Sequence, residues 1–329
     1  MAITKTPFRM SFFGGGTDME WYFREHGGEV LSTTFDKYCY VSVRHLPPFF
    51  DYSSEIVYSR IERVKDASEI EHPLVRNTMQ LLGENDLRIT YDADLPARSG
   101  LGSSSSFAVG LVHAILAMNG KRANKRTLSE LAIQIERELC SEEGGWQDQI
   151  AAAYGGLNHI EFDQIGFHVS PVRITEEKKE ELDQNLLLYF TGFTRFSSEV
   201  QKANKAGSVQ DRILTLEQFR PLTMRASSIL ENNTLNLDEF GVLLGEEWEL
   251  KKQTGKSVTS DKIDHLYKTG MDAGALGGKL LGAGGGGFLL LYVPQDRQEA
   301  VREAMSHLLE VPFHFEEKGS ILLPSMTHD

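Results

Sequence analysis

Four consecutive serines follow two glycines in the stretch LPARSGLGSSSSF, Leu95 to Phe107. A strand-like segment precedes it and ends at Pro96, and a helical pattern begins near Ser103. The first N–H groups of a helix lack partners within the helix, and its dipole places partial positive charge there. Glycine permits close backbone approach, and serine hydroxyls add donors. The pattern favours a nucleotide-phosphate site; a flexible loop with a serine helix cap is the alternative.

Two better-known nucleotide motifs fit this sequence poorly. The Walker pattern G-x-x-x-x-G-K-[ST] is met at its end by TGKS, Thr254 to Ser257, but Leu250 occupies the place of the first glycine. The dinucleotide fingerprint G-x-G-x-x-G is met literally within GAGGGG, residues 282–287. That motif requires a helix after it, whereas the strand-like run FLLLYV follows here. A nicotinamide-dependent dehydrogenase is therefore disfavoured.

The elements that would position this stretch are a mixture of strands and helices. VLSTTFDKYCYVSVRHL is rich in strand-forming residues, and Phe107, Leu111, Ile115 and Met118 recur at helical spacing. A second helix is expected near Thr127, where T-x-x-E fits a capping box. FHFEEKGSILL near the end is expected to be a closing strand pair. The sequence predicts an α+β fold, with domains over 1–175 and 176–329.

Composition narrows the class of protein. The chain has 329 residues, a formal net charge of −13 and two cysteines, Cys39 and Cys140. Such an acidic chain is a poor partner for nucleic acid or anionic lipid, so an anionic ligand would need a local basic pocket. With neither a membrane-spanning run nor a secretory signal evident, we expect a reducing, cytoplasmic setting. The oligomeric state stays open, with a homodimer as one alternative.

Three separated segments together resemble the signature motifs of the GHMP kinases, a family that includes galactokinase and mevalonate kinase. They are TPFRMSFFGGGTD (Thr6–Asp18), LPARSGLGSSSSF, and GGKLLGAGGGGFLLLYV (Gly277–Val293). A fourth segment, IERELCSEEGGWQDQIAAAYGG, resembles the part of the sugar kinases that carries a metal ligand and a catalytic aspartate. The resemblance implies a ribosomal-protein S5-like N-terminal domain and a ferredoxin-like C-terminal domain, with the active site between them.

Within the family, the first motif is similar to that of the heptose 7-phosphate kinases. Gly15 and Gly16 stand where galactokinase has glutamate and histidine, and HGGEVLSTTFDKY follows. The resemblance implies ATP- and Mg²⁺-dependent phosphorylation of the anomeric hydroxyl of D-glycero-D-manno-heptose 7-phosphate, giving the 1,7-bisphosphate. A kinase of fucose or galactose is one alternative. A non-catalytic sugar or nucleotide sensor on the same fold is another.

The resemblance also assigns roles to individual residues. Asp148 would orient the sugar hydroxyl and accept its proton, while Arg9 would keep Asp148 ionised and stabilise transition-state charge. Ser104 and Glu136 would hold Mg²⁺. The ATP phosphates would contact Ser99, Gly100, Leu101, Gly102, Ser103, Ser104, Ser105 and Ser106. The sugar phosphate would contact Gly15, Gly16, Thr17, Asp18, Gly145, Arg195 and Gly285. The candidates to bind the 7-phosphate group of the sugar are Arg195, Lys252, Lys256 and Arg98.

Overall fold

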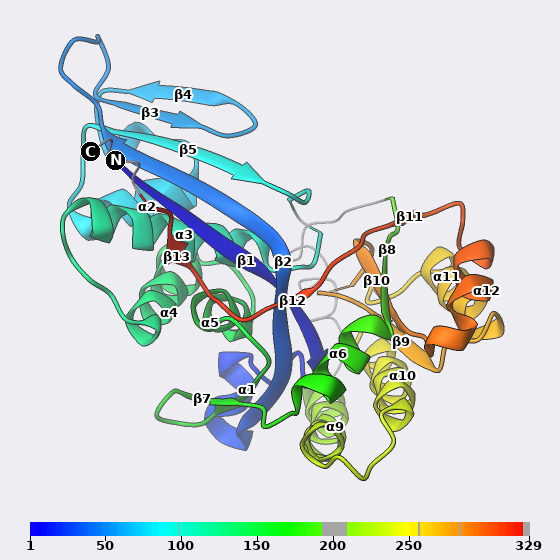
Figure 1. The fold of residues 1–329 in the computed structure, drawn as a ribbon. Coiled ribbons are helices and arrows are strands. Elements are labelled where there is room, and N and C mark those ends of the chain that lie inside the picture. The colour runs from blue at the N-terminus through cyan, green and yellow to red at the C-terminus, as the bar shows by residue number, and fades with distance from the viewer. Residues whose placement is uncertain (98, 193–208, 256, 283, 325–329) are drawn as a thin grey trace.

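The computed structural model of the protein describes residues 1–97, 99–192, 209–255, 257–282 and 284–324. Two sheets organise the chain, and Figure 1 shows helices packed against each of them. The larger sheet has the order β13-β1-β2-β5-β3-β4, and further strands pair with β2 and β6. Its strands are β1 (Ala2–Phe13), β2 (Gly28–His45), β3 (Ser54–Val57), β4 (Ile61–Val64), β5 (Leu87–Ala93), β6 (Asn158–Phe162), β7 (Phe167–Pro171), β12 (Phe315–Glu316) and β13 (Ile321–Leu322).

The long antiparallel pair β1–β2 is the main strand pair of this first region. Both strands are rich in β-branched and aromatic residues, as expected for a strand with a buried face. Their register shifts beside Pro7, which has no N–H to give to the ladder, so that Arg9 pairs with Thr34. The helices of this region are α1 (Glu20–His26), η1 (Ala67–Glu69), α2 (Pro73–Leu82), α3 (Ser103–Met118), α4 (Lys125–Ile133), the π-helical turn η2 (Gln134–Leu139) and α5 (Gln147–Tyr154).

Helix α3 follows the serine-rich stretch and is the central helix of the first region. It is buried over most of its circumference, because it packs on β1 and β2 and is flanked by α4 and α5. Gly110 lets it approach β1 closely: a Cβ there would lie 2.9 Å from Thr6 Oγ1, and Thr4 Oγ1 donates to Gly110 O at 3.0 Å. The start of α3 is therefore fixed relative to the strand that carries Arg9.

Two local expectations are wrong. Helix α4 begins earlier than the T-x-x-E pattern suggested, since Asn124 Oδ1 accepts from Thr127 N at 2.8 Å and acts as the cap. If the α-helical spacing of Leu128, Leu131 and Ile135 continued, Leu139 would lie on the buried face, but Leu139 is exposed and Glu136 is buried. The change to a π-helical turn at Gln134 rotates the following side chains relative to the α-helical pattern.

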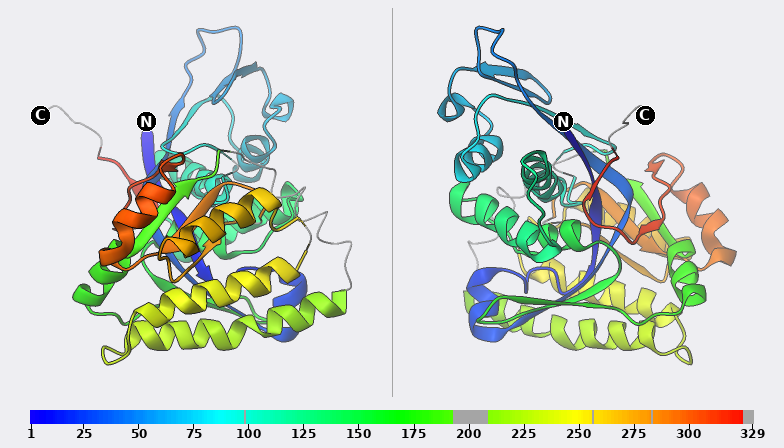
Figure 2. Two further views of the ribbon diagram at one scale, coloured as in Figure 1. Left: turned by 90° about the vertical axis from the view of Figure 1, so that its right-hand side faces the viewer. Right: turned by 60° about the vertical axis from the view of Figure 1, so that its left-hand side comes forward.

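The second region is a four-stranded antiparallel sheet with the order β11-β8-β10-β9. Its two central strands are formed by LLLYF and by FLLLY, the latter within the run that the sequence indicated as strand-like. Figure 2 shows α9 and α10, which pack together, lying side by side below it. The elements are α6 (Glu176–Gln184), β8 (Leu186–Phe190), α8 (Val209–Glu217), α9 (Phe219–Glu231), α10 (Asp238–Gln253), α11 (Asp261–Asp272), β9 (Gly277–Leu280), β10 (Phe288–Tyr292), η3 (Gln295–Arg297), α12 (Gln298–Ala304) and β11 (Leu309–Glu310).

The end of the chain returns to the first sheet. β12 pairs with β2 and β13 pairs with β1, so the expected closing strand pair does not form between these two strands. Asp183 of α6 holds the returning segment, accepting from His314 Nδ1 at 2.8 Å and from Phe315 N at 2.9 Å. The boundary expected between 175 and 176 lies between β7 and α6 and stays a prediction. Within the described residues, no helix combines the length and the apolar character that crossing a membrane requires.

Candidate active site

A cavity of about 860 Å³ lies where the two regions meet, and residues of both line it. Twelve of the residues expected from the sequence line this cavity: Arg9, Gly15, Gly16, Asp18, Gly100, Gly102, Ser103, Ser104, Ser105, Glu136, Gly145 and Asp148. They come from β1, from the glycine-rich turn that follows it, from the start of α3, from η2 and from the start of α5. These twelve residues belong to three of the four sequence motifs, and Gly282 of the remaining motif also lines the cavity, so the fold brings all four motifs together.

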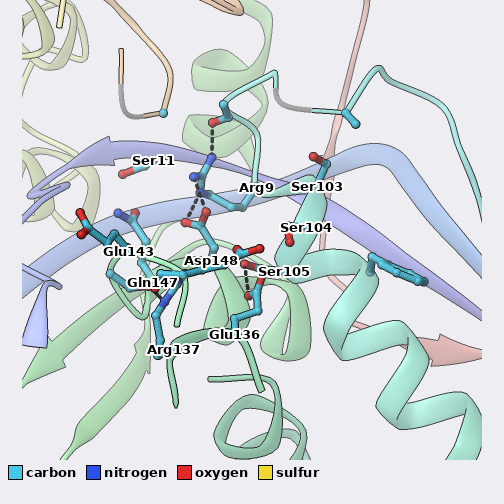
Figure 3. A pocket seen from close by; sticks show the side chains of 18 of the residues that line it. Arg9, Ser11, Ser103, Ser104, Ser105, Glu136, Arg137, Glu143, Gln147 and Asp148 are labelled. Carbon is cyan, nitrogen blue, oxygen red and sulfur yellow. Dashed lines mark hydrogen bonds and ion pairs between the residues drawn. The ribbon is translucent and has the colours of Figure 1, made fainter. Parts of the chain in front are cut away.

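The ion pair between Arg9 and Asp148 lies at the centre of the cavity wall (Figure 3). Arg9 Nε donates to Asp148 Oδ1 and Arg9 Nη2 donates to Oδ2, both at 2.7 Å, which is a bidentate fork. The third guanidinium nitrogen, Nη1, donates to Gly100 O at 2.7 Å. Arg9 is 5% exposed and Asp148 is 22% exposed. The carboxylate is thus held in one orientation while it still faces the cavity.

The start of α3 lies next to this pair. Gly102 precedes the helix with φ +76°, and no side chain caps the helix there. A Cβ at Gly102 would lie 3.3 Å from Arg9 Cγ and 3.5 Å from Asp148 Oδ2, so glycine allows the backbone to reach the ion pair. The uncapped N–H groups of the first turn meet the cavity at Ser103, Ser104 and Ser105. The backbone N–H groups and the partial positive charge at the start of α3 can therefore bind an anionic ligand.

Glu136 and its two hydrogen-bond donors lie behind the serines. Ser105 Oγ donates to Glu136 Oε2 at 2.6 Å, and Gln149 Nε2 donates to the same oxygen at 2.5 Å. Glu136 is only 1% exposed, yet it lines the cavity. The serine that contacts Glu136 is therefore Ser105, whereas Ser104, expected as the partner ligand of a metal, is exposed toward the cavity. Among the described residues, no cluster of three His, Cys, Asp or Glu side chains is placed to hold a metal.

Asp18 is a second buried carboxylate on the same wall. It is 2% exposed; Gly16 N donates to Oδ1 at 2.8 Å, and Gln147 N, at the start of α5, donates to Oδ2 at 3.1 Å. Gly145 has to be glycine here, because a Cβ would lie 1.8 Å from Asp18 Oδ2. Burial, with a smaller contribution from the charge of Asp148, raises the pKa of Asp18 above its ordinary value.

The second region contributes a wall that sequence reasoning missed. Lys251, near the end of α10, lines the cavity and donates from Nζ to Gly282 O at 2.8 Å. Burial, together with the nearby charge of Lys279, lowers the pKa of Lys251 to about 7. Lys252, which the sequence suggested for a phosphate, instead pairs with Glu249 Oε1 at 2.8 Å. Arg137 and Arg212 also line the cavity and were not foreseen.

The opposite end of the cavity is lined by aromatic rings. The imidazole of His72 contacts the rings of Tyr58 and Phe107 edge-on, with centroids 5.0 and 5.6 Å apart, and Tyr91 contacts Phe107 at 4.7 Å. Burial lowers the pKa of His72 below its ordinary value, which favours the neutral ring. This part of the wall is suited to stacking a flat ring, with the Arg60–Glu71 ion pair also in its lining.

Five expected residues do not line the cavity: Thr17, Ser99, Leu101, Ser106 and Gly285. The Thr17 hydroxyl instead closes the glycine-rich turn, donating toward Gly14 O and Glu29 O at 2.8 and 2.9 Å. Ser106 Oγ donates to Pro7 O at 2.9 Å, on the β1 side of α3. Ser99 and Leu101 are fully buried.

The glycines after β9 serve close packing of the two regions. A Cβ at Gly282 would lie 2.4 Å from Gly100 Cα, and one at Gly287 would lie 2.2 Å from Ser99 O. Gly285 N donates to Val258 O at 3.1 Å. Arg195, Lys256 and Arg98 lie outside the described residues.

The fold and site define a phosphoryl-transfer enzyme of one particular family. The protein-family model "GHMP kinases N terminal domain" matches residues 64–156, and the family model "GHMP kinases C terminal" matches residues 229–310. The D-glycero-alpha-D-manno-heptose 7-phosphate kinase of Campylobacter jejuni is 30% identical over 330 residues, which cover 94% of this chain and 96% of that protein. The chain therefore belongs to the GHMP kinase family and is an ATP-dependent phosphotransferase, which confirms the resemblance.

Solved structures agree in fold. The crystal structure of a D-glycero-D-manno-heptose 1-phosphate kinase from Bacteroides thetaiotaomicron is similar with a TM-score of 0.80 and 26% identity, covering 99% of this chain and all of that one. The bifunctional fucokinase/GDP-fucose pyrophosphorylase of Arabidopsis thaliana is 27% identical over 337 residues, which are 92% of this chain and 31% of that protein. The expected two-domain α+β architecture is confirmed.

Proposed function

We propose that this protein transfers the γ-phosphoryl group of ATP to the anomeric hydroxyl of D-glycero-D-manno-heptose 7-phosphate. The product would be the 1,7-bisphosphate, a step toward nucleotide-activated heptose. One observation carries the proposal: the bidentate Arg9–Asp148 pair lies beside the uncapped start of α3 in a single cavity. The relative named for heptose 7-phosphate, which aligns over nearly the whole chain, supports the choice of sugar.

Phosphoryl transfer asks a protein mainly for positioning and for neutralisation of charge. In the proposal, Asp148 accepts a hydrogen bond from the sugar hydroxyl and takes its proton as the oxygen attacks phosphorus. Both carboxylate oxygens are held by the Arg9 fork, so the acceptor direction is set before the sugar arrives. Arg9 also contacts Gly100 O, which ties the acceptor group to the loop proposed to hold the donor phosphates.

The residues present suit Mg²⁺, which prefers oxygen ligands and usually takes one or two carboxylates together with substrate phosphates. Ser105 and Gln149 both donate to Oε2 of Glu136, so Oε1 of its carboxylate would hold the ion together with the Ser104 hydroxyl. Bound there, Mg²⁺ would neutralise phosphate charge. Gln149 and Ser105 fix the carboxylate, and the wall formed by Tyr58, His72, Tyr91 and Phe107 is proposed for the base of the nucleotide.

Asp18 is proposed to contact sugar hydroxyls. Each of its oxygens accepts one backbone N–H and can accept a further donor. An epimer that presents no hydroxyl there would leave a buried carboxylate short of a donor, which costs binding free energy. Gly15 and Gly16, which line the cavity, would leave room for the sugar beside it, whereas Gly145 leaves room for the Asp18 carboxylate itself.

The substrate is tested by steady-state kinetics with ATP and five acceptors: heptose 7-phosphate, heptose 1-phosphate, free heptose, L-fucose and D-galactose. We expect kcat/KM for heptose 7-phosphate to exceed that for each hexose by at least about a hundredfold, since a buried polar site discriminates strongly. Phosphorus NMR of the product should show a second phosphate on the anomeric carbon. Preference for fucose or galactose would favour the alternative kinase, and ligand binding without turnover would favour the sensor.

A further inference from the structure

A buried ion pair fixes α10 against the end of β1. Glu247 Oε2 accepts from Gly14 N at 2.8 Å, and Glu247 Oε1 accepts from Lys279 Nζ at 2.9 Å. Lys279 Nζ also donates to Phe12 O at 2.6 Å. Lys279 is 1% exposed and Glu247 is fully buried. The last turns of α10 are therefore held at a set position beside the glycine-rich turn that lines the cavity.

Lys251 follows Glu247 by one helical turn and so lies on the same face of α10. Its ammonium donates to Gly282 O, and Gly282 packs on Gly100, whose carbonyl accepts from Arg9 Nη1. These contacts place Lys251 at the same end of the cavity as the Arg9–Asp148 pair, on the wall contributed by the second region.

The two neighbouring lysines already have carboxylate partners, namely Lys279 with Glu247 and Lys252 with Glu249. The ion pairs found among the described residues include none for Lys251, whose hydrogen bond goes to a neutral carbonyl. Its charged surroundings are Lys279, Glu247, Arg9 and Asp18. A partly buried ammonium without a carboxylate is unfavourable unless an anion neutralises it.

We propose that the ammonium of Lys251 binds a phosphate oxygen of a substrate, as the cation that the second region contributes opposite the Arg9–Asp148 pair. The inference rests on the proposed function, because it names a group that holds one phosphate of that reaction. The phosphate is either the terminal phosphate of the nucleotide or the phosphate that the sugar already carries. In both cases one N–H of the ammonium donates to Gly282 O and another is left to donate to a phosphate oxygen, a pairing that lysine commonly makes.

The state of Lys251 before binding agrees with this role. Because burial lowers the pKa of Lys251 to about 7, its side-chain amine is only partly protonated near neutral pH. A phosphate dianion beside it favours the charged form, so binding of the phosphate should draw a proton from solution.

The test uses isothermal titration calorimetry on the full chain with Mg²⁺ and four probes: ADP, the ATP analogue AMP-PNP, heptose 7-phosphate and free heptose. Lys251→Met removes the ammonium and keeps the length of the side chain, and Lys252→Met is the matched control. We expect Lys251→Met to weaken binding of one phosphate-bearing probe at least tenfold. Loss for AMP-PNP but not ADP identifies the nucleotide phosphate, and loss for heptose 7-phosphate but not free heptose identifies the sugar phosphate.

Two further measurements separate binding from a structural role. Titration in buffers of different ionisation enthalpy at pH 7.5 should show proton uptake by the wild type that Lys251→Met loses, and Lys251→Arg should recover part of the affinity. Unchanged affinities for all four probes would overturn the inference, as would an equal loss for all four with a lower Tm. The comparison of ADP with AMP-PNP does not depend on the sugar, so it stays informative even if heptose 7-phosphate is not the substrate.

Discussion

Two buried ion pairs join distant segments of this protein, and they differ in their access to the cavity. Arg9–Asp148 joins β1 to α5, and Asp148 keeps 22% of its side chain exposed. Lys279–Glu247 joins β9 to α10, and its members are 1% and 0% exposed. The shortest contacts, 2.7 and 2.9 Å, are similar. Pairing and burial are thus shared, and the open side of Asp148 is what makes it a candidate to receive a proton.

The largest expected effect is the loss of activity in Asp148→Asn. The amide cannot take the proton of the sugar hydroxyl, and it cannot accept both arms of the Arg9 fork. We expect kcat to fall roughly a thousandfold, which is within the usual range for a general base, while nucleotide affinity measured by calorimetry stays within a few-fold of the wild type. A variant that binds both substrates and keeps its kcat would make Asp148 a structural residue.

The fully buried pair Lys279–Glu247 should contribute to the stability of the fold rather than to catalysis. Glu247→Gln leaves the Lys279 ammonium buried without a counter-charge, so we expect the free energy of unfolding to fall by about 3–5 kcal/mol in urea titrations. Because well-packed apolar residues often replace a buried pair at little cost, the double variant Glu247→Leu with Lys279→Met should recover part of this loss. A double variant less stable than Glu247→Gln would show that the hydrogen bonds to Phe12 and Gly14 dominate.

Asp18 extends the comparison to a buried carboxylate whose hydrogen bonds come from backbone N–H groups rather than from a cation. Its folded-state pKa is raised above 3.8, mainly by burial, so folding favours the protonated form. Stability from this group is therefore highest at low pH and declines as pH rises from about 4 through the raised value. The unfolding free energy of the wild type minus that of Asp18→Asn should decrease over this interval. A difference that increases with pH would contradict the assignment.

The smallest effect is expected from an exposed pair. Hydrogen bonding to Asp183 raises the pKa of His314, which is 80% exposed. The contribution is fully present below the unfolded pKa of about 6.5 and is lost as pH rises through the folded value. His314→Gln should lower stability by less than about 1 kcal/mol, measured by urea unfolding at pH 5.5, and by less still at pH 8.5. An equal loss at both pH values would assign the effect to packing.

The sequence contained enough information for the fold class and for the group around Arg9, Asp148 and the start of α3. Periodicity and motif spacing are local signals, and four motifs in order restrict where they can meet. The position of Glu136 behind the serines also follows from the motif, but the serine that contacts it does not. Successive residues on a helix point about 100° apart, so whether Ser104 or Ser105 faces Glu136 depends on where the helix begins.

The features that the sequence did not predict depend on contacts between segments that lie far apart along the chain. Lys251 and Lys252 differ by one step around α10, and which of them faces the cavity depends on how α10 packs, including the contacts of Glu247 with Gly14 and Lys279. The Thr17 hydroxyl belongs to a predicted substrate motif, yet backbone carbonyls of its own turn and of β2 take its hydrogen bond. Likewise, pairing of β12 and β13 with the first two strands joins residues about 280 to 320 positions apart, which no local pattern encodes.

The return of the chain end to the first sheet has a mechanical consequence. The polypeptide passes between the two regions twice, outward before α6 and back after β11, and Asp183 keeps α6 and the returning segment together. Two neighbouring connecting segments restrict the relative rotation of the regions more than a single connecting segment would. Phe12 of β1 and Phe240 of α10 also pack in one hydrophobic core, so the two walls of the cavity are held together by packing as well as by the two crossings.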